Sequence, residues 1–120
     1  MERVRRVEHK GRSIILIDVT GCDAAEVAQL LVEGRRLVAT CPPKSALTLT
    51  DVTGARFDDT ASREAQNNAR ENAPYVRAAA LVGVAGLKKI VYNVVTRATG
   101  RDFKVCDSRE QALEWLAAQP

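Results

Sequence analysis

The 120-residue chain has the length of one compact domain, and its 46% hydrophobic and 28% charged residues fit an ordinary globular protein. This composition excludes intrinsic disorder and fibrous architectures. No apolar run approaches the roughly 20 residues that span a membrane, and no apolar signal region follows the charged first residues. We therefore expect a single cytoplasmic domain over residues 1–120, with no internal repeat or linker long enough to divide it.

The net charge of +3 lies within residues 1–12, which hold five basic and two acidic side chains, while the rest of the chain is balanced. Nucleic-acid-binding domains usually have a broad basic face with aromatic residues, but aromatic residues are only 4% here. We therefore predict no nucleic-acid partner. Basic residues at the start of the chain are typical of an edge strand, where their charge prevents pairing with the edge of another sheet. A weak contact with an acidic surface is the alternative, and pairing with a second copy in a homodimer stays open.

The three cysteines are Cys22, Cys41 and Cys106, and the chain has one histidine, His9. An odd number of cysteines without a C-x-x-C pair predicts reduced, structural thiols. The spacing does not suit a metal site, and no motif of nucleophilic or metal-dependent catalysis is present. We therefore predict a protein that is not an enzyme and that holds no metal and no cofactor.

Two strands are predicted at the start of the chain. Residues Arg3–Glu8 alternate loosely, and a turn at 9–12 leads into a strand over Ser13–Val19. The apolar run at 14–17 lacks alternation, as expected of a strand that is covered on both faces. This second strand should lie inside the sheet.

A helix follows, because Asp23 and Glu26 have the spacing of a capping box. Gly34 lies on the apolar face of that helix, which predicts a close approach to the sheet. The segment 41–43, with two prolines, ends the helix. The alternating residues Ala46–Asp51 then predict a strand.

The next helix is predicted to begin with Asp59 or Thr60 as its cap and to stop at 72–74. Its apolar face consists of three alanines, which bury little area. We therefore predict that this helix is the least firmly anchored in the chain and a mobile or partner-facing element.

The last elements alternate again. A strand over Val76–Val82 is followed by a glycine-containing turn, an amphipathic helix over residues 87–98 and a short strand at 103–105, and a capping box at 108–111 begins a final helix. The resulting order is ββαβαβαβα. It predicts an α/β fold with a mostly parallel five-stranded sheet, an antiparallel first strand and helices packed on the sheet.

Polar residues gather in the loops after the strands, where ligands of open α/β sheets bind. Carboxylates in these loops could hold a divalent cation or position a hydroxyl group, or they could cap turns and helices. The residues concerned are Asp18, Asp51, Asp58, Asp59, Asp107, Thr20, Thr53, Thr60 and Ser62.

The turn with Gly83 and Gly86 precedes two lysines and suggests a phosphate cradle at a helix start. Turn geometry and close packing are the alternative explanation for the two glycines. Lys88, Lys89 and Tyr92 share one helix face, which would contact an anion or lipid headgroups or would simply be solvated.

Several segments together resemble the SpoIIAA-like proteins, small bacterial relatives of the STAS domain. The resemblance spans nearly the whole chain and lies in the order and spacing of its segments. They are His9–Gly11, Leu49–Gly54, Tyr75–Ala78, Val82–Lys89 and Ala112 with Trp115–Leu116.

The resemblance implies a non-catalytic regulatory domain like the anti-sigma-factor antagonists, which bind a protein partner and are switched by phosphorylation. In the phosphate-accepting region of such domains, Thr60 matches one hydroxyl position, Ala61 replaces the other, which is the usual phosphate acceptor, and Ser62 stands where a glycine would be. Thr60 and Ser62 are therefore the candidate phosphate acceptors. Asp58 and Asp59 would repel a phosphate at this helix start. The partner-binding loops implied are those with Asp51, Thr53, Asp59, Gly83 and Gly86.

The family's fold also resembles CRAL-TRIO lipid-transfer domains. This implies an alternative function, the binding of a lipid or another small apolar ligand at a membrane surface. The predicted alanine-faced helix and the helix with Lys88, Lys89 and Tyr92 would open to admit it.

Overall fold

The computed structural model describes residues 2–84 and 104–120. The predicted helix over 87–98 lies outside the described residues, as do Gly86, Lys88, Lys89 and Tyr92.

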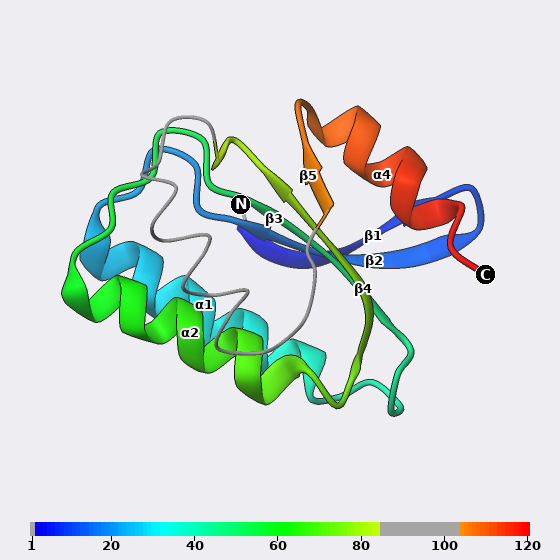
Figure 1. Cartoon of the computed structure of the whole chain (residues 1–120), viewed down its shortest axis with the longest axis horizontal. Coiled ribbons are helices and arrows are strands. Elements are labelled where there is room, and N and C mark those ends of the chain that lie inside the picture. Colours follow the sequence, from blue (N-terminus) through cyan, green and yellow to red (C-terminus); the bar gives the residue numbers. More distant parts are fainter. Residues whose placement is uncertain (1, 85–103) are drawn as a thin grey trace.

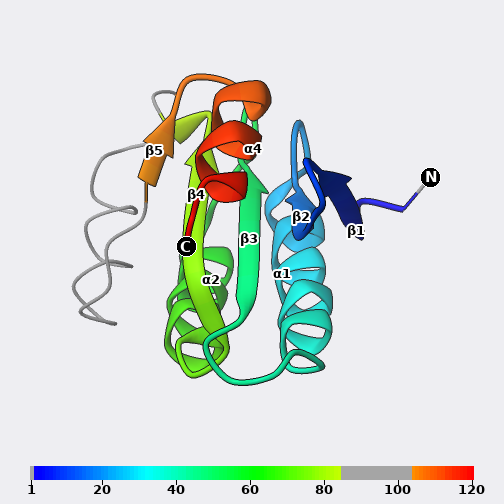
Figure 2. The same cartoon turned by 90° about the vertical axis from the view of Figure 1, so that its right-hand side faces the viewer.

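Five strands form one sheet in the order β1-β2-β3-β4-β5. β1 is antiparallel to β2, and the other neighbours are parallel, with β1 and β5 at opposite edges (Figure 2). The sheet type, the edge position of the first strand and the interior position of the second are therefore confirmed. The strands are β1 (Val4–His9), β2 (Arg12–Asp18), β3 (Ala46–Asp51), β4 (Val76–Val82) and β5 (Lys104–Cys106).

Helices cover both faces of the sheet (Figure 1). The helices α1 (Ala24–Val38) and α2 (Asp59–Asn72) lie on one face, and α4 (Arg109–Ala117) lies on the other. None of the helices within the described residues is long and apolar enough to cross a membrane.

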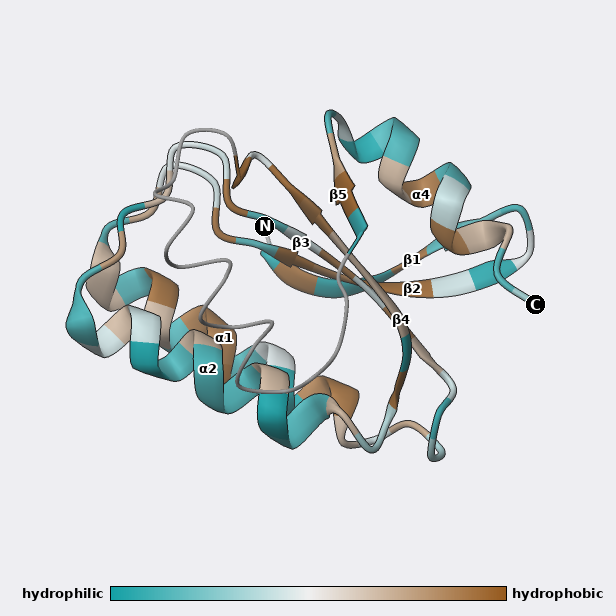
Figure 3. Cartoon of the chain, in the orientation of Figure 1, coloured by the Kyte–Doolittle hydropathy of each residue, from teal (hydrophilic) through white to brown (hydrophobic). Residues whose placement is uncertain are grey.

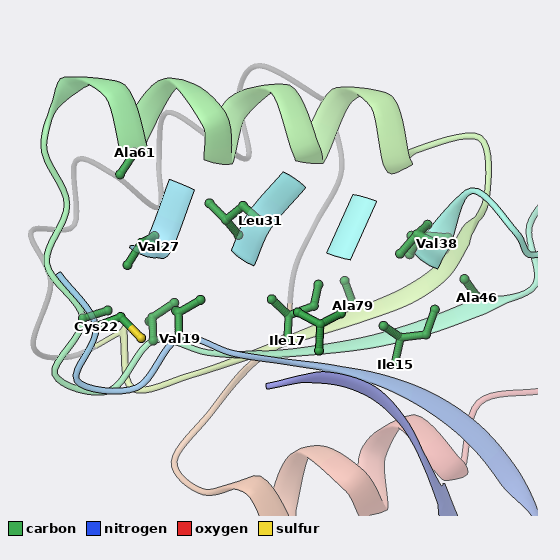
Figure 4. Close-up of a cluster of buried hydrophobic side chains, with 14 residues drawn as sticks. Ile15, Ile17, Val19, Cys22, Val27, Leu31, Val38, Ala46, Ala61 and Ala79 are labelled. Atoms are coloured by element: carbon green, nitrogen blue, oxygen red, sulfur yellow. The ribbon is translucent and has the colours of Figure 1, made fainter. Parts of the chain in front are cut away.

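The apolar run in β2 is buried because its residues alternate between two cores. Ile15 and Ile17 pack in the cluster beneath α1 and α2 (Figure 4), whereas Ile14 and Leu16 pack in the cluster beneath α4. Hydrophobic residues accordingly dominate the middle of the sheet, while the outer surface of α2 is mostly hydrophilic (Figure 3). This two-sided burial is the reason for the absence of alternation in the sequence.

The packing of α1 follows its predicted pattern. Asp23 and Glu26 form the expected capping box. A Cβ atom at Gly34 would lie 2.8 Å from Cδ1 of Ile17, so the glycine allows the close approach of α1 to the sheet.

The buried face of α2 differs from its prediction, because asparagine accompanies alanine. Asn68 and Asn72 are buried together with Ala61 and Ala69. The Nδ2 group of Asn68 donates a hydrogen bond of 2.6 Å to the carbonyl oxygen of Leu31 in α1, which satisfies the amide nitrogen, whereas its Oδ1 atom is buried without a hydrogen-bond partner among the described residues.

Asp58 is the N-cap of α2, so the predictions of Asp59 or Thr60 were wrong. The Oδ1 atom of Asp58 accepts a hydrogen bond of 2.8 Å from the backbone N–H of Ala61. Three adjacent residues could all act as caps, and only the backbone direction of the preceding loop selects among them.

Replacing Asp58 with alanine should therefore lower the free energy of unfolding by about 1 kcal/mol, because an N–H of the first turn loses its partner. The Asp59→Ala variant should change it by less than about 0.5 kcal/mol. Urea denaturation of both variants measures the difference. Equal effects of the two substitutions would contradict the assignment of the cap.

Candidate functional site

The same four-residue sequence, Asp-Val-Thr-Gly, occurs at the carboxyl ends of β2 and β3. Asp18-Val19-Thr20-Gly21 ends the first of these strands, and Asp51-Val52-Thr53-Gly54 ends the second. Asp18 and Asp51 are register partners in the parallel pair of strands, so the repeat places two carboxylates side by side.

Each aspartate folds its own loop in the same way. Oδ1 of Asp18 accepts hydrogen bonds from the backbone N–H and the hydroxyl of Thr20, at 3.0 and 2.7 Å. Oδ1 of Asp51 accepts the equivalent bonds from Thr53, at 3.1 and 2.7 Å. Such side-chain to backbone bonds two residues on are Asx turns, which fix the start of a loop. Both Oδ2 atoms are left to bind another group.

Arg109, the first residue of α4, binds both remaining oxygens. Its Nη2 lies 3.0 Å from Oδ2 of Asp18, and its Nε lies 2.6 Å from Oδ2 of Asp51. The side chain of Asp51 is 7% exposed, that of Asp18 21% and that of Arg109 37%. We name Asp18, Asp51 and Arg109 the aspartate–arginine cluster. It ties α4 to the carboxyl ends of two neighbouring strands.

The charges of this cluster stabilise one another. Burial acts to raise the pKa of Asp18, but hydrogen bonds from Thr20 and the nearby guanidinium of Arg109 outweigh it and lower this pKa. Burial acts to lower the pKa of Arg109, but its bonds to Asp51 and Asp18 raise it above its ordinary value. The ionised forms of Asp18 and Arg109 are therefore favoured.

Backbone hydrogen bonds join the two loops that follow these strands, 19–23 and 52–58, which we name the strand-end loops. The N–H of Gly21 donates to the carbonyl oxygen of Thr53 at 2.9 Å, and the N–H of Arg56 donates to that of Cys22 at 3.0 Å. The two loops therefore form one hydrogen-bonded unit.

Gly83, directly after β4, packs against the second of these loops. Its φ angle is +85°, and a Cβ atom there would lie 2.2 Å from Oγ1 and 2.6 Å from the backbone nitrogen of Thr53. Only glycine fits this contact. Two explanations were considered for the glycines of this turn, a phosphate cradle and the needs of turn geometry and close packing. The second explanation accounts for Gly83.

The structure brings together some of the predicted site residues. Asp51, Thr53 and Gly83 meet at the ends of β3 and β4; Asp51 is buried, whereas Thr53 is exposed. Asp59, Thr60 and Ser62 lie instead in the first turns of α2, where Thr60 is exposed and Ser62 is half-buried. The hydrogen bonds seen among the described residues do not connect this helix start with Asp51.

The structure also describes the cysteines and the residues that could bind a metal ion. Cys22, Cys41 and Cys106 are free thiols, and burial raises the pKa of Cys22 and of Cys106, so both stay protonated. Within residues 2–84 and 104–120, no three His, Cys, Asp or Glu side chains are grouped so that they could hold a metal ion.

A pocket of about 210 Å³ lies at the other end of the sheet, at the start of β2 and β3. Polar and apolar residues both line this pocket, so the lining does not favour an apolar ligand. Lipid binding therefore stays a prediction. The lining residues are Arg6, Ser13, Ile15, Thr40, Cys41, Pro42, Ser45, Ala46 and Leu47.

Arg109 is the residue that inspection of the sequence missed. No local pattern marks it, because its partner Asp51 is 58 positions away. The repeated tetrapeptide is the available signal: two identical turns at neighbouring strand ends bring two carboxylates together, and these require a cation.

Comparison with protein-family models and with curated proteins gave no match. Among solved structures, the chain is similar to an uncharacterised protein of the DUF3478 family with a SpoIIAA-like fold, from Shewanella loihica PV-4. The TM-score is 0.67 at 14% sequence identity, and the match covers 94% of this chain and 91% of the other. The predicted SpoIIAA-like fold is therefore confirmed.

Proposed function

We propose that this protein is a non-catalytic regulatory domain that binds a protein partner through its strand-end loops and the start of α2. The observation that carries the proposal is the fixed arrangement of these loops. Their backbones are hydrogen-bonded to each other, and two aspartates beneath them are held by Arg109. A surface that is ordered before binding loses little conformational entropy when a partner docks.

The exposed residues of this surface suit polar recognition. Thr53, Asp59 and Thr60 are exposed, so they would contact the partner directly. Asp51 is buried and bonded to Thr53 and Arg109, so its contribution would be to position Thr53. The resemblance to anti-sigma-factor antagonists supports a protein as the partner.

The proposal is tested by site-specific photo-crosslinking in the native host. A photoreactive amino acid at Thr60 should give a discrete adduct with one protein, identified by mass spectrometry. The matched control is Lys44, an exposed residue that precedes β3 at the opposite end of the sheet. The proposal fails if neither Thr53 nor Thr60 gives an adduct, or if Lys44 gives the same one.

A phosphate switch would act at the same surface. Thr60 is the more accessible of the two candidate hydroxyl groups, and the helix start favours an anion, although Asp58 and Asp59 oppose it. Intact-mass analysis of protein from the host would detect the phosphate. If wild type and the Thr60→Ala, Ser62→Ala variant gave the same amount of the adduct formed from Thr53 under every growth condition, the switch would be disproved.

A further inference from the structure

The outer edge of β1 has polar backbone groups that face away from the sheet. In an antiparallel pair, the residues that exchange hydrogen bonds alternate along each strand. The N–H of Asp18 donates to the carbonyl oxygen of Arg3 at 2.9 Å, and the register of β1 with β2 continues from this pair. Residues 3, 5, 7 and 9 therefore bond to β2, and the N–H and C=O groups of Val4, Arg6 and Glu8 point outward.

The basic residues near this edge protect it less than the sequence suggested. Arg3 lies 3.5 Å from Asp18, and Lys10 lies 2.6 Å from Glu114. Both cations are thus neutralised within the chain. Apart from these two cations, the charged side chains along β1 are Arg5, Arg6 and Glu8. They comprise two positive charges and one negative charge.

We propose that β1 pairs with β1 of a second copy of this chain, antiparallel, with Val7 on the two-fold axis. A two-fold axis perpendicular to the sheet places one residue opposite itself. With Arg5, Arg6 or Glu8 on the axis, like charges would meet, and with Val4 on the axis Arg3 of one copy would lie opposite Arg5 of the other. Like charges directly opposite each other destabilise a strand pair. With Val7 on the axis, Arg6 of each copy lies opposite Glu8 of the other.

The same register also satisfies the outward backbone groups. Arg6 and Glu8 both point their N–H and C=O groups outward, so each of the two Arg6–Glu8 pairs forms two backbone hydrogen bonds. On the other face of the strand, the two Val7 side chains meet. Edge position, backbone direction and charge pattern therefore agree on one arrangement.

The test is sedimentation of the full chain over a range of concentrations, with a charge swap. The wild-type chain should dimerise. Arg6→Glu and Glu8→Arg should each weaken the dimer at least about tenfold, because both cross-strand pairs become repulsive. The double variant Arg6→Glu, Glu8→Arg should restore it. A wild-type chain that stays monomeric at several hundred micromolar, or a dimer indifferent to the swap, would overturn the proposal.

Two further variants separate pairing from other roles of these residues. Arg6 also donates a hydrogen bond of 2.8 Å to Oγ1 of Thr40, so Thr40→Val serves as the control and should leave the dimer unchanged. Glu8→Pro removes an outward N–H and spares the bonds to β2. It should weaken the dimer and keep the monomer folded, as thermal unfolding would show; unchanged dimerisation of this variant would also overturn the proposal.

Discussion

Replacement of Arg109 with methionine is expected to lower the free energy of unfolding by about 2 to 3 kcal/mol. Methionine keeps much of the side-chain volume but leaves Asp51 without its cation and Asp18 with only Arg3, 3.5 Å away. An uncompensated buried charge is costly. We place the effect below that of a fully buried pair because the Arg109 side chain is 37% exposed and water screens its charge.

The matched control is Arg36→Met. Arg36 is exposed in the last turn of α1, so its replacement should change stability by less than about 0.5 kcal/mol. Adding Asp18→Asn and Asp51→Asn to Arg109→Met should recover part of the lost stability, because the repulsion disappears. Urea denaturation measures all of these variants. Equal effects of Arg109→Met and Arg36→Met would show that the cluster does not stabilise the fold.

The contribution of the cluster should depend on pH. The pKa of Asp18 is lower in the folded protein than its ordinary value of 3.8. The unfolded chain therefore takes up the proton first as the pH falls, so stability that is fully present above about pH 4 is lost as the pH passes through the folded pKa. The difference between wild type and Arg109→Met should accordingly be largest near pH 7 and shrink toward pH 3.

Periodicity in the sequence was enough to predict the sheet. The residues of each strand alternate between its two faces, so the strand's own sequence shows which faces are buried. The apolar run of β2 reflects burial between two layers, and the Asp23–Glu26 spacing is a local capping pattern. The N-cap of α2 was misplaced by one or two residues. Asp58, Asp59 and Thr60 are equally suitable chemically, so only the path of the preceding loop distinguishes them.

The site was predicted less well because its main contacts are not local. Asp51 and Thr53 were identified from their position at a strand end, but the guanidinium that holds Asp51 comes from α4, 58 positions later in the chain. The burial of Asn68 was also missed. Its partner is a backbone carbonyl oxygen of α1, and such a partner leaves no trace in the pattern of side chains.

Replacement of Gly83 with alanine is expected to cost about 3 kcal/mol or more. A φ angle of +85° alone strains an alanine by about 1 kcal/mol. The added Cβ would also overlap Thr53, whose Oγ1, nitrogen and Cα lie 2.2, 2.6 and 2.7 Å from it. Overpacking of this kind typically costs about 1 to 3 kcal/mol.

The Gly21→Ala variant separates the strain of the positive φ angle from the overlap of the added Cβ atom with its neighbours. Gly21 also has a positive φ angle, +67°, but a Cβ atom there would meet nothing within 4 Å. This variant should lose only about 1 kcal/mol, and the remainder in Gly83→Ala is then the cost of the contact. Because two of the three contacts are to the backbone of Thr53, adding Thr53→Ala should not rescue Gly83→Ala. A full rescue would show instead that the hydroxyl group alone requires glycine, and that the loop backbone can move away from β4.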